Sequence, residues 1–510
     1  MSLLHKLRAP GSLTVNVLSG AFANLGTAAI HLVFTGACAF FLGPEAFGIV
    51  AFSTTVLLTV VFLNQFTTPV VVRTLAAQGS DPEGIIGGWQ VLRSFELVSV
   101  GTGIAIGILI AAGAPLLARY GLKGNHVSQQ TVLWSVQLIG LQIACQWPSY
   151  FYRAGFVGLA RQDVFASIAV PFAALQSGGA LLLLWLVSPD LLLLFCWLAA
   201  TSLAYSLVLR VLLLRHMPPA PEKIGRNWKT PSSVWRFSAG TLVIGLGASL
   251  LTQTDKLVIS TFVPLSVFSA YSLASMLAVQ VVTVVASPLT VSLLPRFSAL
   301  FSSAEQRTLA AEYHRWTQLL MVIMLPVLGV LFAFGDPVLK LWLGAQSPLV
   351  PLSSQFLPVL SIGTMFSIMM IPPYLLQMSV GWSSLLAGFN VCAWGLMIVA
   401  LLVGVPRVGA LAGAYCWLAL NVGYYLVMVP LMHRRLIPQE KWLWWTRDTL
   451  LPWAVNLSIF LISARFGSPG RGLVVSLMHA AVTAAVSGGV LIAMLPAART
   501  ELRRLSAGAY

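Results

Sequence analysis

The sequence predicts an all-α polytopic membrane protein with about 14 transmembrane helices, arranged as two pseudo-symmetric six-helix lobes followed by two C-terminal helices. Three observations lead to this prediction. Of the 510 residues, 58% are hydrophobic and only 8% are charged, whereas a soluble domain carries about 25% charged residues. The hydrophobic residues form long segments, and a weak repeat relates the two halves of the chain.

Fourteen apolar segments are visible along the chain. Most reach the roughly 20 residues that a helix needs to cross the hydrocarbon core of a bilayer. The first follows the basic start MSLLHKLRAP and exceeds the roughly 7–15 apolar residues of a cleavable signal, so we expect a retained first helix. The predicted segments are 16–42, 46–70, 92–118, 131–152, 164–187, 191–214, 234–262, 267–294, 316–335, 350–378, 380–404, 408–432, 448–466 and 472–495.

The positions of Lys and Arg predict the orientation. When the loops alternate from a cytoplasmic N-terminus, 22 of the 29 basic residues fall on the cytoplasmic side, six fall outside, and Lys256 lies within a helix. Cytoplasmic loops of membrane proteins are enriched in Lys and Arg. We therefore expect both termini in the cytoplasm, and topology accounts for the net charge of +15 without a nucleic-acid partner.

The longest polar stretch, RHMPPAPEKIGRNWKTPSSVWR, predicts a cytoplasmic linker between two halves. FFLGPEAFGIVAFSTTVL in the first half aligns with STFVPLSVFSAYSLASML in the second, which places Pro44 opposite Pro264. Arg73 and Arg296 follow at similar distances, and weak internal repeats are common in secondary transporters. We expect an N-terminal lobe at 1–214, the linker at 215–236, a C-terminal lobe at 237–432, and two further helices with a cytoplasmic tail at 433–510.

The loops carry no recognisable catalytic motif. The chain has no GxxxxGK[ST] phosphate-binding loop and no HExxH zinc motif, and no nucleophile stands in a convincing arrangement with a base. Its five cysteines lie within apolar segments, at spacings that indicate neither disulfides nor a metal site. The sequence thus predicts neither an enzyme nor a cofactor or metal, and the function must reside within the helix bundle.

Several segments resemble Wzx-type polysaccharide flippases. They are LGPEAFGIVAF between the first two helices, RTLAA beginning at Arg73, QTDKLVISTFVPLSVFSAYSLASML with the later PLTVSLLPRFSAL, and YHRWTQLLMVIMLPVLGVLFAFGDPVLKLWLG at 313–344. The resemblance covers roughly residues 15–435. It is specific for the superfamily of multidrug, oligosaccharidyl-lipid and polysaccharide exporters, the MOP superfamily, and less specific within it.

This resemblance implies two six-helix lobes around a central cavity, with two extra helices. It also implies a substrate, an undecaprenyl-diphosphate-linked oligosaccharide, which crosses the bacterial cytoplasmic (inner) membrane by alternating access coupled to a gradient of protons or sodium ions. The repeat unit would then enter synthesis of lipopolysaccharide O-antigen, capsule or exopolysaccharide. A polysaccharide polymerase and a chain-length regulator are the expected partners.

The stretch LTQTDKLVIST contains two adjacent charged candidates. A cation at the bilayer centre costs about 2.5–3.5 kcal/mol on an insertion scale, so Lys256 is a candidate for binding phosphate or sugar. Alternatively, Lys256 extends to the periplasmic interface. Asp255 is a candidate for ion coupling, or else anchors a neighbouring helix. Because adjacent residues on a helix do not face each other, we expect each to have its own partner.

Three arginines and one histidine complete the candidate set. Arg73, Arg153 and Arg296 lie at the cytoplasmic ends of predicted helices. There they either anchor the helices at the interface or gather the diphosphate with planar guanidinium groups. His31, within the first helix, either carries a proton or forms a hydrogen bond between helices. KWLWWTRD at 441–448 is typical of an interfacial anchor.

Three alternatives stay open. A cation-coupled multidrug antiporter of the same superfamily would need acidic groups in the N-terminal lobe, and the first two helices offer no membrane-embedded acid. A lipid II flippase usually carries arginines in its first helix, where this chain offers Asn16, Asn24 and His31. A membrane polysaccharide polymerase or ligase would need a large periplasmic loop, and none is evident.

Overall fold

The computed structural model describes residues 13–65, 67–78, 82–124, 126–219, 247, 249–303, 305–382, 384–466 and 472–506. Within these ranges almost every residue is helical and none is in a strand, as predicted. The chain forms two compact units, Met1–Ser266 and Val267–Tyr510. The predicted linker from residue 220 onward, the predicted start of the seventh helix near Val234, and the first 12 residues lie outside the described ranges. The predicted lobe boundaries stay a prediction.

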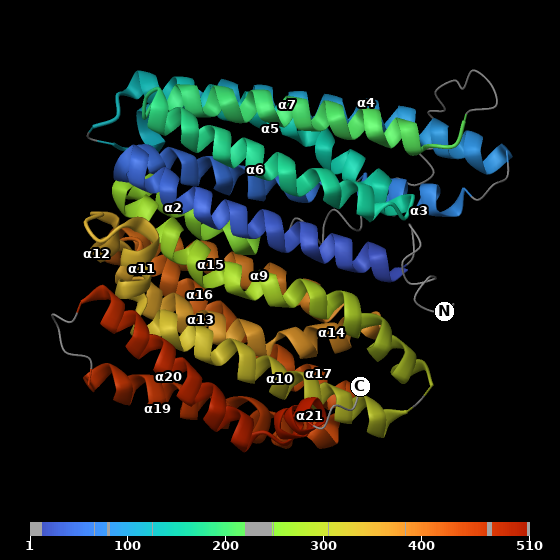
Figure 1. Ribbon diagram of the computed structural model, residues 1–510, viewed down its shortest axis with the longest axis vertical. Coiled ribbons are helices and arrows are strands. Elements are labelled where there is room, and N and C mark those ends of the chain that lie inside the picture. Colours follow the sequence, from blue (N-terminus) through green and yellow to red (C-terminus); the bar gives the residue numbers. More distant parts are fainter. Residues whose placement is uncertain are drawn as a thin grey trace. The chain divides into compact units, whose positions relative to one another are not determined.

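The first unit consists of long helices that run side by side (Figure 1). α5 packs against α4 and α7, and α6 packs against α2. A further helical segment covers residues 249–262, and the Ser249 hydroxyl donates to the carbonyl oxygen of Leu58 at 2.9 Å. The labelled helices are α2 (Leu13–Val60), η1 (Val61–Gln65), α3 (Thr68–Ala77), α4 (Pro82–Leu116), η2 (Leu117–Gly121), α5 (Gln129–Gly158), α6 (Gln162–Leu186) and α7 (Leu191–His216).

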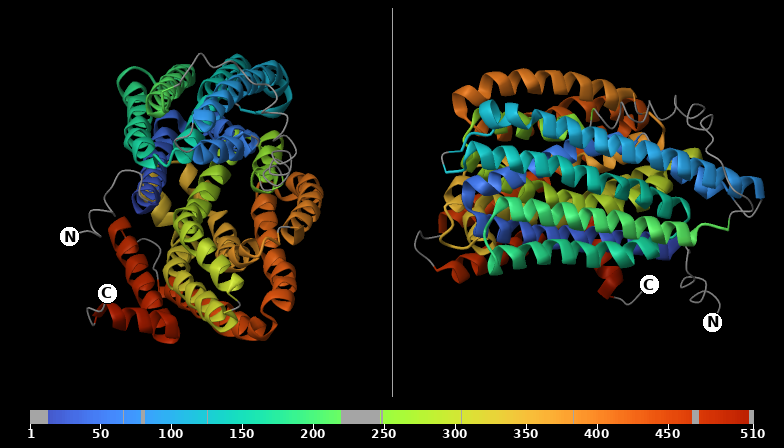
Figure 2. Two further views of the ribbon diagram at one scale, coloured as in Figure 1. Left: turned by 90° about the vertical axis from the view of Figure 1, so that its right-hand side faces the viewer. Right: turned by 90° about the horizontal axis from the view of Figure 1, so that it is seen from above.

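The second unit combines long helices with several short ones (Figure 2). Its core surrounds α10, which packs against α13, α19, α20 and α21. The helices are α9 (Leu265–Ser302), α10 (Gln306–Ala333), α11 (Gly335–Leu343), α12 (Leu349–Ser354), α13 (Leu357–Met369), α14 (Ile371–Ser379), α15 (Ser384–Val408), α16 (Leu411–Gly423), η3 (Tyr424–Met428), α17 (Val429–Leu436), η4 (Pro438–Glu440), α18 (Lys441–Leu443), η5 (Trp444–Leu450), α19 (Leu451–Phe466), α20 (Leu473–Met494) and α21 (Pro496–Ser506).

Two features of the first unit depend on glycine. Gly43 interrupts α2 with φ 76° and ψ 176°, a region that is essentially restricted to glycine, and divides the helix into 13–42 and 44–60. Gly107 of α4 and Gly140 of α5 face each other, and a Cβ on either would lie within 2.7 Å of the other's carbonyl oxygen. Small residues allow such close backbone contact between membrane helices.

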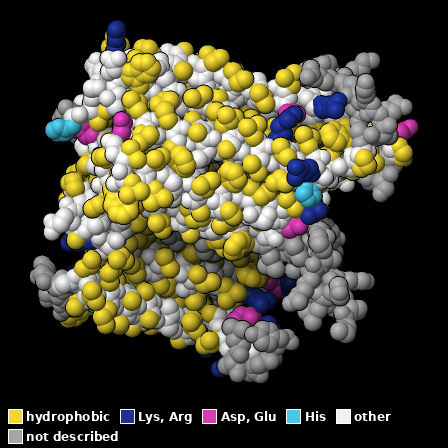
Figure 3. All heavy atoms as spheres, turned by 45° about the horizontal axis from the view of Figure 1, so that its top comes forward, with side chains coloured by type: hydrophobic (Ala, Val, Ile, Leu, Met, Phe, Trp, Pro, Cys, Tyr) yellow, Lys and Arg dark blue, Asp and Glu magenta, His cyan; other side chains and the backbone are white. Residues whose placement is uncertain are grey.

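Ten described helices are long and apolar enough to cross a membrane. The sequence predicted fourteen spans, four more than these ten. One of the four arises because Gly43 divides α2, which is counted here as a single helix. The other three are α5, the segment 249–262 and α9, which are not among the ten. The helical polytopic membrane fold is confirmed, and the number fourteen stays a prediction. Figure 3 shows a mainly hydrophobic surface along the helices, with charged side chains near the helix ends, as a bilayer requires.

Candidate functional site

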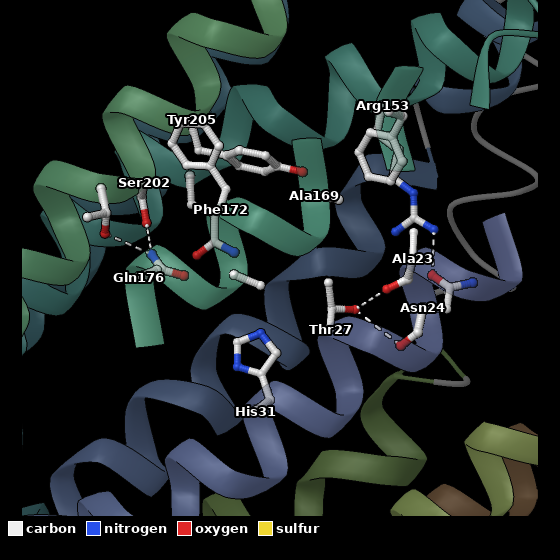
Figure 4. A pocket seen from close by; sticks show the side chains of 14 residues that line it. Ala23, Asn24, Thr27, His31, Arg153, Ala169, Phe172, Gln176, Ser202 and Tyr205 are labelled. Carbon is white, nitrogen blue, oxygen red and sulfur yellow. Dashed lines mark hydrogen bonds between the residues drawn. The ribbon is translucent and has the colours of Figure 1, made fainter. Parts of the chain in front are cut away.

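A polar cavity lies within the first unit, among α2, α5, α6 and α7 (Figure 4). Its volume is about 180 Å³, smaller than the roughly 300–1,000 Å³ of pockets for drug-sized ligands, so it suits one group of a larger ligand. Alanines on α2 and α6 keep this space open. The polar residues that line it are Asn24, Thr27, His31, Gln146, Arg153, Gln176, Thr201, Ser202 and Tyr205, and the aromatic rings of Phe165 and Phe172 complete it.

Helical spacing brings the polar groups of α2 to one face. Asn24, Thr27 and His31 follow one another at intervals of three and four residues, so their side chains line the same side of the helix. The His31 ring is directed into the cavity (Figure 4). The Thr27 hydroxyl turns back onto its own helix and donates to the carbonyl oxygen of Ala23 at 2.7 Å. The His31 side chain thus extends into the space, whereas the Thr27 hydroxyl does not.

Arg153 forms one end of the cavity. Its Nη2 donates to Oδ1 of Asn24 at 3.1 Å, and its guanidinium carbon lies 5.1 Å from the centre of the Phe165 ring. No carboxylate of the described residues forms an ion pair with it. A guanidinium group has five N–H donors. Most of the donors of Arg153 thus remain available to an anionic ligand.

Gln176 forms the other end. Its Nε2 donates to the hydroxyls of Thr201 and Ser202, each at 3.1 Å, which ties α6 to α7 (Figure 4). The indole N–H of Trp197 donates to the carbonyl oxygen of Gln176 at 2.9 Å and fixes the same turn of α6. Between the two ends, the rings of Phe172 and Tyr205 lie with their centroids 5.2 Å apart. This end offers hydrogen-bonding groups and aromatic surface without a formal charge.

The charge of the cavity has one sign. Arg153 and His31 are the basic residues that line it, and no Asp or Glu of the described residues does. The structure thus brings together two of the six predicted site residues, although 122 positions separate them in the sequence. A water-containing recess with low-dielectric walls concentrates the field of such groups. The cavity therefore favours anions over cations.

The prediction that Asp255 and Lys256 each have a partner of their own stays a prediction, but the two also contact each other, with Lys256 Nζ 3.6 Å from Asp255 Oδ1. The flexible lysine stem allows this, and Nζ also donates to the carbonyl oxygen of Thr252 at 3.3 Å. The Asp255 residue is 7% exposed. The pair lies on 249–262 and does not line the cavity.

The two remaining candidates lie elsewhere. Arg73 is exposed on α3 and is not among the residues that line the cavity. Arg296 belongs to the second unit, where its Nη2 donates to Oε1 of Glu312 at 2.6 Å. Its role in phosphate binding stays a prediction, as does that of Arg73.

Sequence reasoning missed two groups of residues. Gln176 and its hydroxyl partners stand in ordinary apolar segments, and no local signal marks them. The segment KWLWWTRD was interpreted as an interfacial anchor, but its Trp444 and Asp448 are fully buried. Asp448 contacts His314 of α10, 134 positions earlier. The sequence did contain one signal for this cluster: Asp448 is an acidic residue at the start of a predicted membrane-spanning segment.

The fold defines the class of the protein. It resembles an inward-facing multidrug resistance MATE family transporter of the MOP superfamily, with a TM-score of 0.62 and 15% identity over 81% of this chain and 96% of the other. It also resembles the lipid II flippase MurJ in an inward closed conformation, with a TM-score of 0.68 and 10% identity over 93% of this chain and 98% of the other. A MOP superfamily transporter from Pyrococcus furiosus matches with a TM-score of 0.51 and 15% identity over 86% and 98%. The protein has the MOP transporter fold.

The chain belongs to the polysaccharide biosynthesis protein family, whose model matches residues 38–348. No curated protein matched the sequence. The family and the fold are those of exporters and flippases, not of enzymes.

Proposed function

We propose that the protein is a flippase that moves an undecaprenyl-diphosphate-linked oligosaccharide repeat unit to the outer leaflet of the bacterial cytoplasmic membrane. The product serves O-antigen, capsule or exopolysaccharide synthesis. The observation that carries this proposal is the charge of the cavity, which offers Arg153 and His31 and no carboxylate among the described residues. Membership of the polysaccharide biosynthesis family supports the glycan part of the substrate.

In this proposal Arg153 binds the diphosphate. Its planar group holds phosphate oxygens through paired N–H donors, and the contacts with Asn24 and Phe165 keep it oriented before the ligand arrives. The sugar next to the diphosphate lies toward Phe172, Tyr205 and Gln176. In this proposal the pocket holds the junction of diphosphate and first sugar and the rest of the repeat unit lies outside it, which agrees with the small volume.

The other predicted residues have supporting roles in this proposal. Arg73, Lys256 and Arg296 guide the diphosphate during alternating access, and Asp255 and His31 couple transport to a proton or sodium gradient. Both termini lie in the cytoplasm, and a polysaccharide polymerase and a chain-length regulator use the flipped repeat units.

A lipid II flippase is the second candidate, because the MurJ structure aligns over nearly the whole chain. A multidrug antiporter receives less support, since cationic drugs need an acidic site and no carboxylate of the described residues lines the cavity. For the Pyrococcus furiosus transporter, a reversed polarity of the binding pocket suggests a different function. Pocket charge thus differs between members of this fold and is related to what they transport.

The test uses a deletion strain of the host, complemented with variants at Arg153, in which surface polysaccharide and lipid-linked repeat units are measured. We expect Arg153→Lys to keep part of the export, Arg153→Gln to reduce it about 10- to 100-fold, and Arg153→Glu to abolish it, because a hydrogen bond to a charged group contributes about 1.5–3 kcal/mol. Repeat units should accumulate on the cytoplasmic face.

Arg119→Gln is the matched control, since Arg119 is exposed on η2 and does not line the cavity. Normal export by a stable Arg153→Glu variant would contradict the proposed site. Accumulation of lipid II with arrested growth in the deletion strain would favour the second candidate. Intact polymer with altered drug tolerance would favour the antiporter.

A further inference from the structure

Three ionisable side chains meet in the second unit, far along the chain from the cavity residues. His314 lies on α10, Glu440 ends η4, and Asp448 lies in η5, a segment of π-helix. His314 Nε2 is 3.0 Å from Oε2 of Glu440, and His314 Nδ1 contacts Oδ2 of Asp448. Gln318, one turn along α10, donates its Nε2 to Oδ1 of Asp448 at 2.7 Å. We call these four residues the His314 cluster.

The contacts of His314 require one extra proton. A neutral imidazole carries a single N–H and can donate to only one carboxylate. With both carboxylates ionised, the second contact would bring two lone pairs together. Both contacts form once a further proton is present, either on the ring as imidazolium or on the Glu440 carboxyl, which then donates to Nε2. In each case the cluster holds one proton more than a neutral ring with two carboxylates.

The cluster is closed on one side and open on the other. The Asp448 side chain is 1% exposed, whereas that of Glu440 is 29% exposed. Behind His314, the Tyr313 hydroxyl and His433 Nε2 lie 3.1 Å apart, and Trp444 stacks on the Tyr313 ring. Exchange with solvent therefore occurs at the Glu440 end.

Other charged groups on the surrounding helices have different contacts. Arg315 of α10 contacts Glu312 and Glu501, and Lys441 lies over the ring of Trp442, 5.0 Å from its centre. The titratable and charged groups on the packed elements include Arg307, Glu312, Tyr313 and Arg315 of α10, Tyr425 of η3, His433, Arg434 and Arg435 of α17, Lys441 of α18, Arg447 of η5, Arg465 of α19, His479 of α20, and Arg499, Glu501, Arg503 and Arg504 of α21.

The cluster connects segments that are far apart in the sequence. His314 holds the stretch from Glu440 to Asp448, which leads into α19. Gln318 Oε1 accepts a hydrogen bond from the backbone N–H of Ala497 at 3.0 Å, so the start of α21 is held by the same turn of α10. One face of α10 therefore fixes both ends of the α19–α20 hairpin.

We propose that His314, Asp448 and Glu440 form a proton-binding site, and that the bound proton ties residues 438–443, which form η4 and α18, to α10. When the proton leaves, the contact between His314 and Glu440 loses its hydrogen and residues 438–443 are released, while the pair of His314 with Asp448 holds η5 in place. The proton is retained at low pH and lost as pH rises, so the tie weakens with rising pH. This inference goes beyond the proposed function and does not depend on the substrate.

The test is hydrogen–deuterium exchange of the purified full-length protein in nanodiscs between about pH 5.5 and 9, the range in which histidine commonly titrates. Rates are corrected for the intrinsic pH dependence of amide exchange with peptides from α5 as reference. In the wild type, we expect peptides covering 438–443 to exchange about 10-fold faster at the upper end of the range than at the lower end, while peptides covering 444–450 stay protected by the pair of Asp448 with His314.

Two variants distinguish an effect of the bound proton from a general loss of folded structure. In Glu440→Gln the amide can donate to neutral Nε2, so we expect protection at every pH. In His314→Asn the shorter amide can donate to Asp448 in the place of Nδ1 but does not reach Glu440, and we expect fast exchange at every pH. His479→Gln is the control, because His479 Nε2 contacts only the Ser463 hydroxyl among the described residues, and it should keep the wild-type profile. Corrected exchange that is independent of pH in the wild type, or a wild-type profile in Glu440→Gln, would overturn the proposal.

Discussion

The cavity of the first unit and the His314 cluster of the second unit place similar groups in opposite settings. In the cavity, Arg153 donates one N–H to Asn24, and its guanidinium group borders open space. In the cluster, both nitrogens of His314 and both oxygens of Asp448 have partners within the protein. An apolar bundle tolerates polar groups when they are satisfied. Where the protein leaves donors unused beside a cavity, a ligand can satisfy them.

This comparison predicts which substitutions lower the amount of folded protein and which lower only its transport activity. Changes in the cluster should lower the amount of folded protein, because unpaired groups would stay buried. Changes in the cavity should lower export at constant protein amount, because the altered groups border space that is already open.

The largest effect on stability is expected for Asp448→Ala, which leaves His314 and Gln318 without their buried partner. Removing one member of a buried pair costs about 3–5 kcal/mol. We expect little folded protein in the membrane, measured by fluorescence-detected size exclusion. Asp336→Ala is the control: Asp336 pairs with Lys340 at 2.6 Å, but its side chain is 48% exposed, and such pairs contribute about 0–1 kcal/mol. Equal yields of the two variants would contradict the expectation that the buried cluster stabilises the fold more than an exposed ion pair does.

A smaller effect on stability and a clear one on export are expected for Gln176→Leu. The Thr201 hydroxyl keeps its bond to the carbonyl oxygen of Trp197 at 2.8 Å, so the folded state should lose only about 1–2 kcal/mol. Export should fall because the uncharged end of the cavity loses its amide. Ser167→Ala on the same helix is the control, since that hydroxyl bonds only to Val164 among the described residues. Unchanged export per folded molecule would show that Gln176 does not contribute to substrate binding.

The smallest effect is expected for Thr27→Val. The Thr27 hydroxyl donates within its own helix, to Ala23 and Asn24, and valine has nearly the same shape. We expect export within about 2-fold of the wild type, because losing a local hydrogen bond costs roughly 0.5–1.5 kcal/mol and affects the fold more than the ligand. A loss of export at normal protein amount would show that this oxygen contacts the substrate, and would extend the ligand-facing surface along α2.

The helical membrane fold follows from the sequence because long apolar segments leave the backbone no other way to satisfy its hydrogen bonds in a bilayer. The Lys256–Asp255 contact was not predicted, because helix geometry fixes where a side chain starts and not where a flexible stem ends. The same limit applies to Arg153 and His31: the residues were candidates, but their meeting depends on how α2 and α5 pack.

The His314 cluster shows a different limit. A π-helical turn over Trp444–Leu450 buries Trp444, Asp448 and Thr449 together. Trp444 and Asp448 are four residues apart and would share a face even in a regular helix, and the π-helical period adds Thr449, five residues after Trp444. The tryptophans beside basic residues, which are typical of an interface, led to the wrong interpretation of this segment. The change of period is a tertiary effect, stabilised by contacts with α10.

Gly43 also bears on how the chain is synthesised. The spans on either side of it are joined without an intervening loop, because its backbone takes a conformation that other residues avoid. We therefore expect the two spans to enter the bilayer together during translation. A side chain at this position would delay that step, and the cell would hold fewer inserted molecules, each with normal transport.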